Sequence, residues 1–279
     1  MELLSYRFFV YALGAALLVS FSCALIGSYI VSRRMVFVSG GITHASFGGI
    51  GLGYFLGIPP LVGATLFAIV SAVGFDLLAR RSKIRLDSMI GILWSMGMAI
   101  GIVLIYLTPG YAPNLTSYLF GNILAVSPSD LILMLVLAAL NGLFFIFFHQ
   151  SILYLAFDEE FLRAMKIRTD WLNALLMALI ALTIVITIRM VGIILVISML
   201  TIPQATASLI IHDFKAMILY SLVFGIAASI SGLFLSFYLN IPSGATIIFC
   251  SGLLFGLVKL IQSIIDHYHT VQRLSGRSG

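Results

Sequence analysis

Residues 39–57 read SGGITHASFGGIGLGYFLG and contain no Asp, Glu, Lys or Arg. We predict that this segment is a membrane-spanning helix despite its glycines, because in lipid the backbone must form its hydrogen bonds within the segment. Small residues recur in it at every fourth position. They are Gly41, Ala45, Gly49, Gly53 and Gly57. Such a row lets helix backbones approach closely, so it predicts tight packing against neighbouring helices.

His44 belongs to the adjacent row, between Gly40 and Gly48. The two glycines leave room beside the imidazole for another group. An ionisable residue inside a span is a functional candidate, and neutral imidazole binds zinc, manganese or iron. His44 is therefore a candidate transient metal ligand, and other helices or a second copy of the chain would have to complete the site. The alternative is a histidine satisfied by a hydroxyl or carbonyl group of a neighbouring helix.

The composition is that of a polytopic membrane protein. Of the 279 residues, 61% are hydrophobic and only 9% are charged, and the mean hydropathy is +1.16. Soluble domains contain about a quarter charged residues. The net charge of +5 comes from short loops and the tail, as in cytoplasmic segments, so we expect no nucleic-acid partner. Cys23 and Cys250 lie in apolar runs and indicate small core residues.

The hydrophobic segments predict an all-α fold in one transmembrane domain, residues 1–279. We expect about nine crossings with the N-terminus outside, or eight if one segment is a half-span. The predicted spans are residues 8–31, 39–57, 61–78, 87–106, 131–148, 171–188, 192–211, 216–238 and 243–264. Pro203 should kink or break its span. Gly91, Ser95 and Ala99 form a second predicted packing row.

Two further segments are too short or too polar to span. For residues 118–130 we predict a short outer or re-entrant element. Residues 266–279 form a basic cytoplasmic tail, in which we expect His267 and His269 to be solvated rather than to hold a regulatory metal.

Residues 156–168 read AFDEEFLRAMKIR and are the most charged segment of the chain. They predict a short helix with acids in the first turn and bases toward the end, which suits the helix dipole. Apolar side chains recur along one side of it. A solvated connecting helix is one interpretation, but an apolar row favours docking of a cytoplasmic partner. The residues assigned to docking are Phe157, Asp158, Glu159, Glu160, Phe161 and Arg163.

Several signatures of other functions are missing from the sequence. It has no GxxxxGK[ST] phosphate loop, no GxSxG elbow and no HExxH motif, so we expect a transporter rather than an enzyme. Asp76, Asp130 and Arg189 fall near membrane borders, where each is predicted to be an interfacial group. Because no acidic residue lies at mid-membrane, as a proton-driven carrier would have, an external energy source is expected.

Five stretches then support a family resemblance: GGITHASFGGIGLG, DSMIGILWSMGMAIG, YLFGNILAVSPSD, AFDEEFLRAMKIR and VGIILVISMLTIPQATA. In them, and over nearly its whole length, the chain resembles the permease subunits of metal-type ATP-binding-cassette (ABC) importers, the zinc, manganese and iron family of bacteria. The resemblance implies a type II importer permease that forms a homodimer in the bacterial inner membrane. It implies three partners: the second copy, a cytoplasmic ATPase dimer and an extracytoplasmic metal-binding protein. Residues 156–168 would be the coupling helix, and no cofactor would be permanently bound.

One position departs from the family pattern. Many members carry an Asp one turn before the histidine, in a GDxxxHA pattern, and that position is Gly40 here. His44 therefore carries over as a pathway ligand, but the carboxylate does not. Because imidazole suits zinc and carboxylate suits manganese, the departure favours zinc, although Ser39, Thr43 or other helices could supply oxygen. The alternatives are manganese, iron or a metal chelate as cargo, and a channel or carrier that works without an ATPase.

Overall fold

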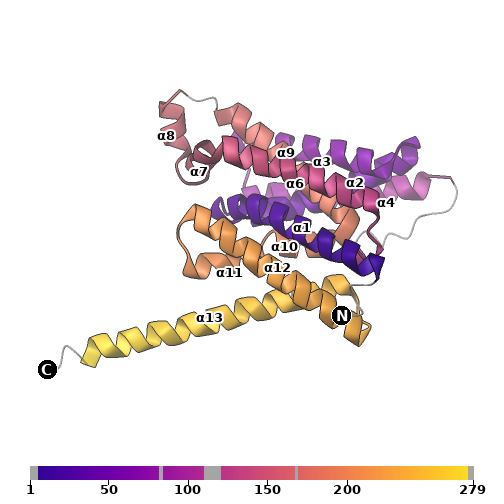
Figure 1. Cartoon of the computed structure of the whole chain (residues 1–279). Helices are drawn as coiled ribbons and strands as arrows, with labels where there is room; N and C mark the ends of the chain where they lie inside the picture. Colours follow the sequence, from indigo (N-terminus) through magenta and orange to yellow (C-terminus); the bar gives the residue numbers. More distant parts are fainter. Residues whose placement is uncertain (1–5, 82–83, 110–120, 167–168, 276–279) are drawn as a thin grey trace.

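The computed structural model describes residues 6–81, 84–109, 121–166 and 169–275, and the side chains of all of these except 80–81 and 268–275. The described chain is built of helices, as predicted (Figure 1). They are α1 (Arg7–Ser32), α2 (Val36–Leu56), α3 (Pro60–Arg81), α4 (Leu86–Leu107), the 3-10 turn η2 (Ile123–Ala125), α6 (Pro128–Phe147), α7 (His149–Phe157), α8 (Glu159–Ala164), α9 (Thr169–Val191), α10 (Ile193–Met199), α11 (Ile202–Ile210), α12 (Phe214–Leu239) and α13 (Ser243–Ser275).

Within the described residues, eight helical segments are long and apolar enough to cross a membrane, with α10 and α11 counted as one. The helix α2 is not among them although it has 21 residues, because Gly, Ser, Thr and His lower its hydropathy. It is nevertheless buried over most of its length. With α2 included, nine helical segments of the described chain match the nine predicted spans in position. The low hydropathy of α2 is therefore compatible with a span, because its neighbouring helices shield α2 from lipid.

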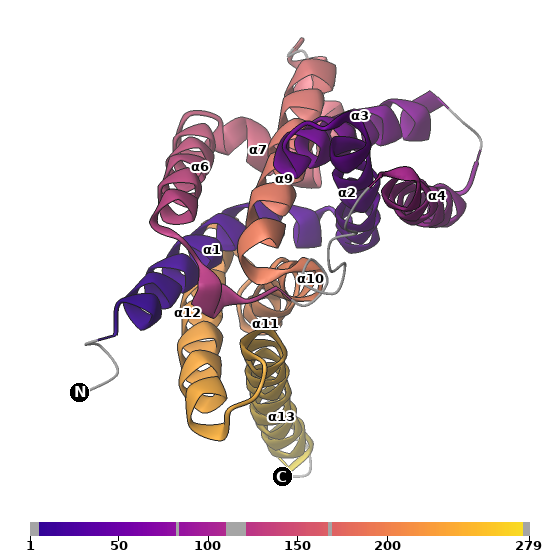
Figure 2. The same cartoon turned by 90° about the vertical axis from the view of Figure 1, so that its right-hand side faces the viewer.

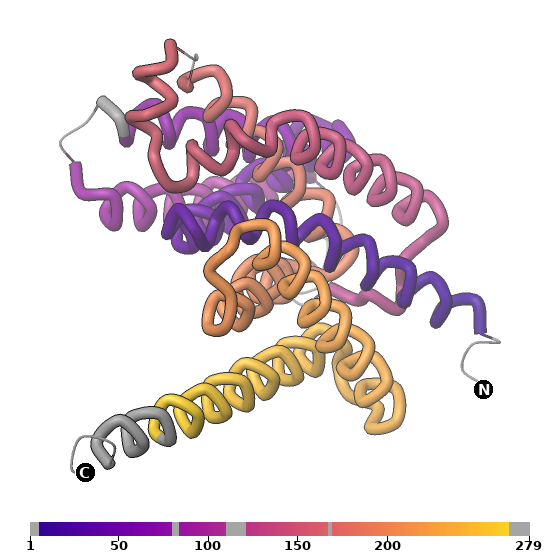
Figure 3. Tube along the Cα trace, turned by 60° about the vertical axis from the view of Figure 1, so that its left-hand side comes forward, coloured from indigo at the N-terminus to yellow at the C-terminus, as the bar shows by residue number. Residues whose placement is uncertain are grey.

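The helices are arranged around α9. Figure 2 shows α2, α3 and α4 grouped on one side of α9 and α1 and α6 on the other. In Figures 2 and 3, α1 lies between α6 and α12. The helix α8 and the end of α13 lie at the same end of the molecule (Figures 1 and 3). Because Arg33, Arg163 and Lys215 lie in the loops and helix ends on this side, it is the cytoplasmic end.

Pro203 breaks the seventh predicted span, as expected. The helix α10 ends at Met199 and α11 begins at Ile202, with Pro203 in its first turn. Proline has no N–H to donate, and a first-turn position requires none. Next to this break, Gln204 crosses to α1, where its Nε2 donates to the carbonyl oxygen of Cys23 at 2.7 Å. Cys23 and Cys250 are both buried, as predicted for core residues.

Some boundaries differ from the prediction. Instead of one helix over 156–168, α7 ends at Phe157 and α8 begins at Glu159. The break arises because the Asp158 carboxylate accepts the N–H of Phe161 at 3.0 Å and so caps a new helix. The predicted tail begins as helix, because α13 extends to Ser275. Residues 167–168 and 276–279 of these segments, and 118–120 of the predicted outer element, lie outside the described residues.

Candidate functional site

The helix that carries His44 is pressed against α4 by small residues. A Cβ atom added to Gly97 would lie only 2.4 Å from the Cα of Ala45, and one added to Gly51 would lie 2.5 Å from the carbonyl oxygen of Gly101. Real Cβ atoms do not approach other atoms so closely, so α2 and α4 touch backbone to backbone. The predicted row Gly91, Ser95 and Ala99 is exposed instead. Within one chain this row therefore packs against no other helix, because α4 turns its other small residues, Gly97 and Gly101, toward α2.

The opposite side of α2 contacts α3 in the same way. Cβ atoms added to Gly49 and Gly63 would each lie 2.4 Å from the other's carbonyl oxygen, and one on Gly53 would lie 2.7 Å from the Cα of Pro60. Each four-residue step turns about 40° around a helix. The predicted row is therefore divided: Gly41 and Ala45 face α4, whereas Gly49 and Gly53 face α3. Gly57 caps α2 with a left-handed φ of 68°.

His44 stacks on the indole of Trp94 in α4. The two ring centroids are 3.9 Å apart and the planes differ by 11°. A Cβ atom on Gly40 would also meet this indole, at 3.9 Å, so Trp94 occupies the room beside the imidazole. His44 Nδ1 is buried and no described group forms a hydrogen bond with it. A buried nitrogen without a partner is energetically costly, which makes it a candidate to gain a ligand when the pathway opens.

Other ligands near His44 are few. Ser39 and Thr43 each donate their hydroxyl to a carbonyl oxygen of α2, at 2.8 Å and 2.7 Å, which leaves lone pairs on both oxygens. Among the described residues, His, Cys, Asp and Glu form no group of three that could hold a metal. One chain therefore offers a single imidazole, together with hydroxyl oxygens, rather than a tight metal-binding site.

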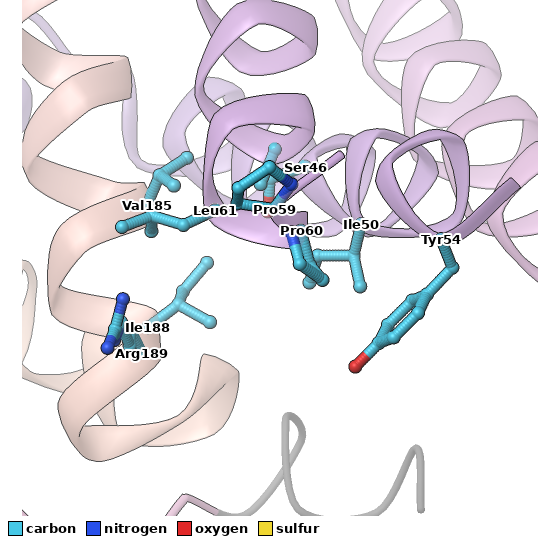
Figure 4. A pocket seen from close by; sticks show the side chains of 10 residues that line it. Ser46, Ile50, Tyr54, Pro59, Pro60, Leu61, Val185, Ile188 and Arg189 are labelled. Atoms are coloured by element: carbon cyan, nitrogen blue, oxygen red, sulfur yellow. The ribbon is translucent and has the colours of Figure 1, made fainter. Parts of the chain in front are cut away.

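A cavity of about 340 Å³ lies at the outer end of the bundle, between α2, α3 and α9 (Figure 4). Ile50 and Tyr54 lie on one side of it and Arg189 on the other. Arg189 Nε donates to the Asp130 carboxylate at 2.8 Å, so these two predicted interfacial groups form an ion pair. Ser46 also lines this cavity and follows His44 by two residues, roughly 200° around the helix. The cavity therefore lies on the side of α2 away from Trp94.

At the cytoplasmic end, Glu159 joins three helices. Its carboxylate accepts hydrogen bonds from Arg33 at 2.9 Å, from Arg163 at 2.9 Å and from Asn173 at 3.4 Å. Arg33, which caps α1, also donates to the carbonyl oxygen of Leu155 in α7 at 2.7 Å. The side chains of Arg33 and Glu159 are 22% and 18% exposed, so water screens this pair less than a surface ion pair.

In and beside α8, one apolar side chain is buried and three are exposed. Leu162 of α8 is buried and anchors the helix, whereas three apolar side chains are exposed: Phe157 at the end of α7 by 62%, Phe161 in α8 by 44% and Met165, directly after α8, by 56%. Glu160 is exposed as well. These three apolar side chains at the cytoplasmic end, here called the α8 apolar patch, are held in place by the Glu159 network beneath them. An exposed apolar patch on a polar surface is typical of a protein-binding site.

A second cavity, of about 650 Å³, lies between α8 and the first turn of α2. Arg33 and Glu159 line it together with Val38 of α2 and Asp76 of α3. The turn that joins α1 to α2 is thus linked to α8 through the Arg33–Glu159 ion pair, which borders this cavity.

Sequence reasoning did not assign roles to Trp94 or Arg33. Trp94 could have been noticed as one of two tryptophans, but the partner of Arg33 is 126 residues away.

Comparison with known proteins finds the same architecture. The profile described as the ABC 3 transport family matches residues 5–262. The chain is 43% identical to the "Uncharacterized membrane protein slr2045" of Synechocystis, over 88% of each chain. It is 35% identical to the "Manganese transport system membrane protein MntC" of Halalkalibacterium halodurans, over 96% of this chain and 92% of that one. The solved structure "PsaBC from Streptococcus pneumoniae in complex with Fab" has a TM-score of 0.82 at 33% identity, over 92% of each chain.

Proposed function

Because the chain belongs to the ABC 3 transport family and is a multi-pass metal-type importer permease, we propose that it conducts a divalent transition metal ion past His44. The observation that carries this proposal is the position of His44, whose buried Nδ1 has no partner. A single imidazole binds an ion weakly enough to release it again, as a transport pathway requires. The ion is the cargo and not a resident cofactor.

The pathway is completed by a second copy of this chain. One chain supplies one imidazole, and zinc in proteins takes four ligands. Two copies related by a two-fold axis would supply two imidazoles together with hydroxyl oxygens from α2. The proposed assembly is therefore a homodimer, which receives the ion from an extracytoplasmic metal-binding protein.

The α8 apolar patch is the proposed contact with a cytoplasmic ATPase. The patch consists of Phe157, Phe161 and Met165, and Glu160 is exposed beside it. Apolar side chains on an anchored helix suit insertion into a groove of a partner. Glu159 and Arg33 would then transmit movement of α8 to the turn before α2.

The ligand set favours zinc as the cargo, because His44 supplies an imidazole and position 40, one helical turn before it, is a glycine that supplies no carboxylate. Manganese is the second candidate. It is supported by the 35% identity to the Halalkalibacterium protein, whose name describes a manganese transport system.

The test is the elemental content of bacteria that lack this chain, grown with limiting metal. The strain is complemented with the native protein, His44→Ala or His212→Ala; His212 is an exposed histidine and serves as the matched control. We expect a zinc deficit that the native protein and His212→Ala correct and that His44→Ala leaves in place at equal membrane abundance. A manganese deficit would establish the second candidate. The absence of any transition-metal deficit, or full rescue by His44→Ala, would contradict the pathway proposal.

The alternative of a channel or carrier without an ATPase has its own test. Purification of the native protein should recover a nucleotide-binding subunit, and a Phe161→Ala variant should recover much less of it. Metal uptake that continues unchanged in cells depleted of ATP would show that the chain works alone.

A further inference from the structure

A groove of about 510 Å³ lies between α1, α6 and α12 and shares no lining residue with the His44 region. The helix α1, which lies between α6 and α12 (Figures 2 and 3), forms its floor with Phe21 and Leu25. Phe145 of α6 and Ile218 of α12 form its walls. Because these helices span the membrane, the groove lies at the depth of lipid acyl chains, and its apolar lining suits them.

The cytoplasmic end of the groove carries one lysine and one histidine. It is lined there by His149, the first residue of α7, and by Lys215, in the first turn of α12. The N-terminus of α12, a helix of 26 residues, adds the positive end of its dipole. Asp213 lies beside them, but its carboxylate caps α12 by accepting the N–H of Ala216 at 2.8 Å.

The charge of Lys215 acts on the His149 imidazole. Burial lowers the pKa of His149, the charge of Lys215 lowers it further, and Asp213 acts in the opposite direction. His149 is therefore neutral near pH 7 and acts as a hydrogen-bonding group, while Lys215 carries the positive charge. A phosphate placed between them would gain one ion pair and one hydrogen bond.

We propose that this groove binds a phospholipid of the inner leaflet that has an anionic headgroup. The headgroup phosphate contacts Lys215 and His149, and one acyl chain lies over Phe21 and Leu25. Gly142 also lines the groove, and from Gly142 to the end of α6 at Phe147 the helix rises about 8 Å, enough for the first part of an acyl chain. Basic pockets between spanning helices on the cytoplasmic side bind anionic lipid headgroups in this way.

The test compares lipid retention by the purified full-length protein. Native mass spectrometry follows the protein after equilibration with equal amounts of phosphatidylglycerol and phosphatidylcholine in mixed micelles. The native protein should retain phosphatidylglycerol in preference, and Lys215→Ala should reduce that preference about five-fold, since one basic residue near an anionic headgroup contributes about 1 kcal/mol. Lys259→Ala removes an exposed lysine from α13 and should leave the preference unchanged.

A second variant tests the groove itself. Ile218→Trp fills the apolar wall without changing any charge, and it should lower retention of both lipids. Equal retention of the two lipids by the native protein would overturn the proposal, as would an unchanged preference in Lys215→Ala. If Lys215→Ala does not accumulate, Lys215→Gln takes its place with the same expected result.

Discussion

The guanidinium of Arg33 joins the end of α1 to Glu159 of α8 at 2.9 Å, while its second nitrogen holds the Leu155 carbonyl oxygen of α7 at 2.7 Å. One side chain thus connects the cytoplasmic helices to the turn from which α2 begins. Since α2 carries His44, movement of α8 has a short physical route to the centre of the bundle. The neighbouring cavity of about 650 Å³ gives these groups space to move.

Glu159→Gln keeps the shape of this link but removes its charge. We expect metal uptake per ATP hydrolysed to fall several-fold in proteoliposomes that contain the permease and its ATPase, with hydrolysis itself maintained. The control is Asp87→Asn, which neutralises a carboxylate that is 82% exposed on α4. Arg33→Gln should give the same defect, and the double variant should be no worse than either single variant. Additive losses would show that the two residues act separately.

Gly49→Ala should destabilise the protein, whereas Gly40→Ala should not. The new methyl group of Gly49→Ala would meet the backbone of α3 at 2.4 Å, but at Gly40 it meets only Trp94 at 3.9 Å. Overpacking of this kind costs about 1–3 kcal/mol. Thermal unfolding in detergent, followed by tryptophan fluorescence, measures the difference. Equal midpoints for the two variants would contradict the assigned contact between α2 and α3.

Gly40→Asp should raise manganese uptake relative to zinc uptake several-fold. The added carboxylate lies one helical turn before His44, there is space for its Cβ, and carboxylate oxygen is a preferred ligand of manganese. The matched control is Gly40→Asn, which has the same size and no charge. Competition between radioactive manganese and unlabelled zinc gives the ratio. An identical ratio in the Asp and Asn variants would mean that position 40 does not face the ion.

Trp94→Leu should lower metal uptake by roughly two- to ten-fold, because a stacked aromatic pair is worth about 0.5–1.5 kcal/mol and here it orients the imidazole. Trp94→Phe keeps a flat ring and should retain most of the uptake. Trp171→Leu, at a tryptophan that is 58% exposed on α9, is the control. Metal uptake is measured at matched abundance of each variant in the membrane. Full uptake by Trp94→Leu would contradict a role of the indole in the pathway.

Local pattern predicted most of the helices. Apolar runs of about twenty residues identified the spans because a bilayer imposes that length, and Pro203 marked the break between α10 and α11 because its ring cannot continue the hydrogen-bond ladder. The glycine-rich helix was recognised for the same local reason. Asp158 shows the limit of this reasoning: its carboxylate could belong to a first helical turn or cap a new helix, and the structure has the cap.

The sequence by itself determined that this chain spans a membrane, which helix carries the single mid-span histidine, and where the charged cytoplasmic segment lies. Only the tertiary structure decided which small residues of α4 face α2, that Trp94 covers His44, and that Arg33 meets Glu159. Small residues at four-residue spacing occur on two faces of α4, and only packing against α2 distinguishes them. The contacts of Trp94 with His44 and of Arg33 with Glu159 join residues 50 or more positions apart in the sequence. Whether such residues meet depends on how the helices pack together and not on any local preference.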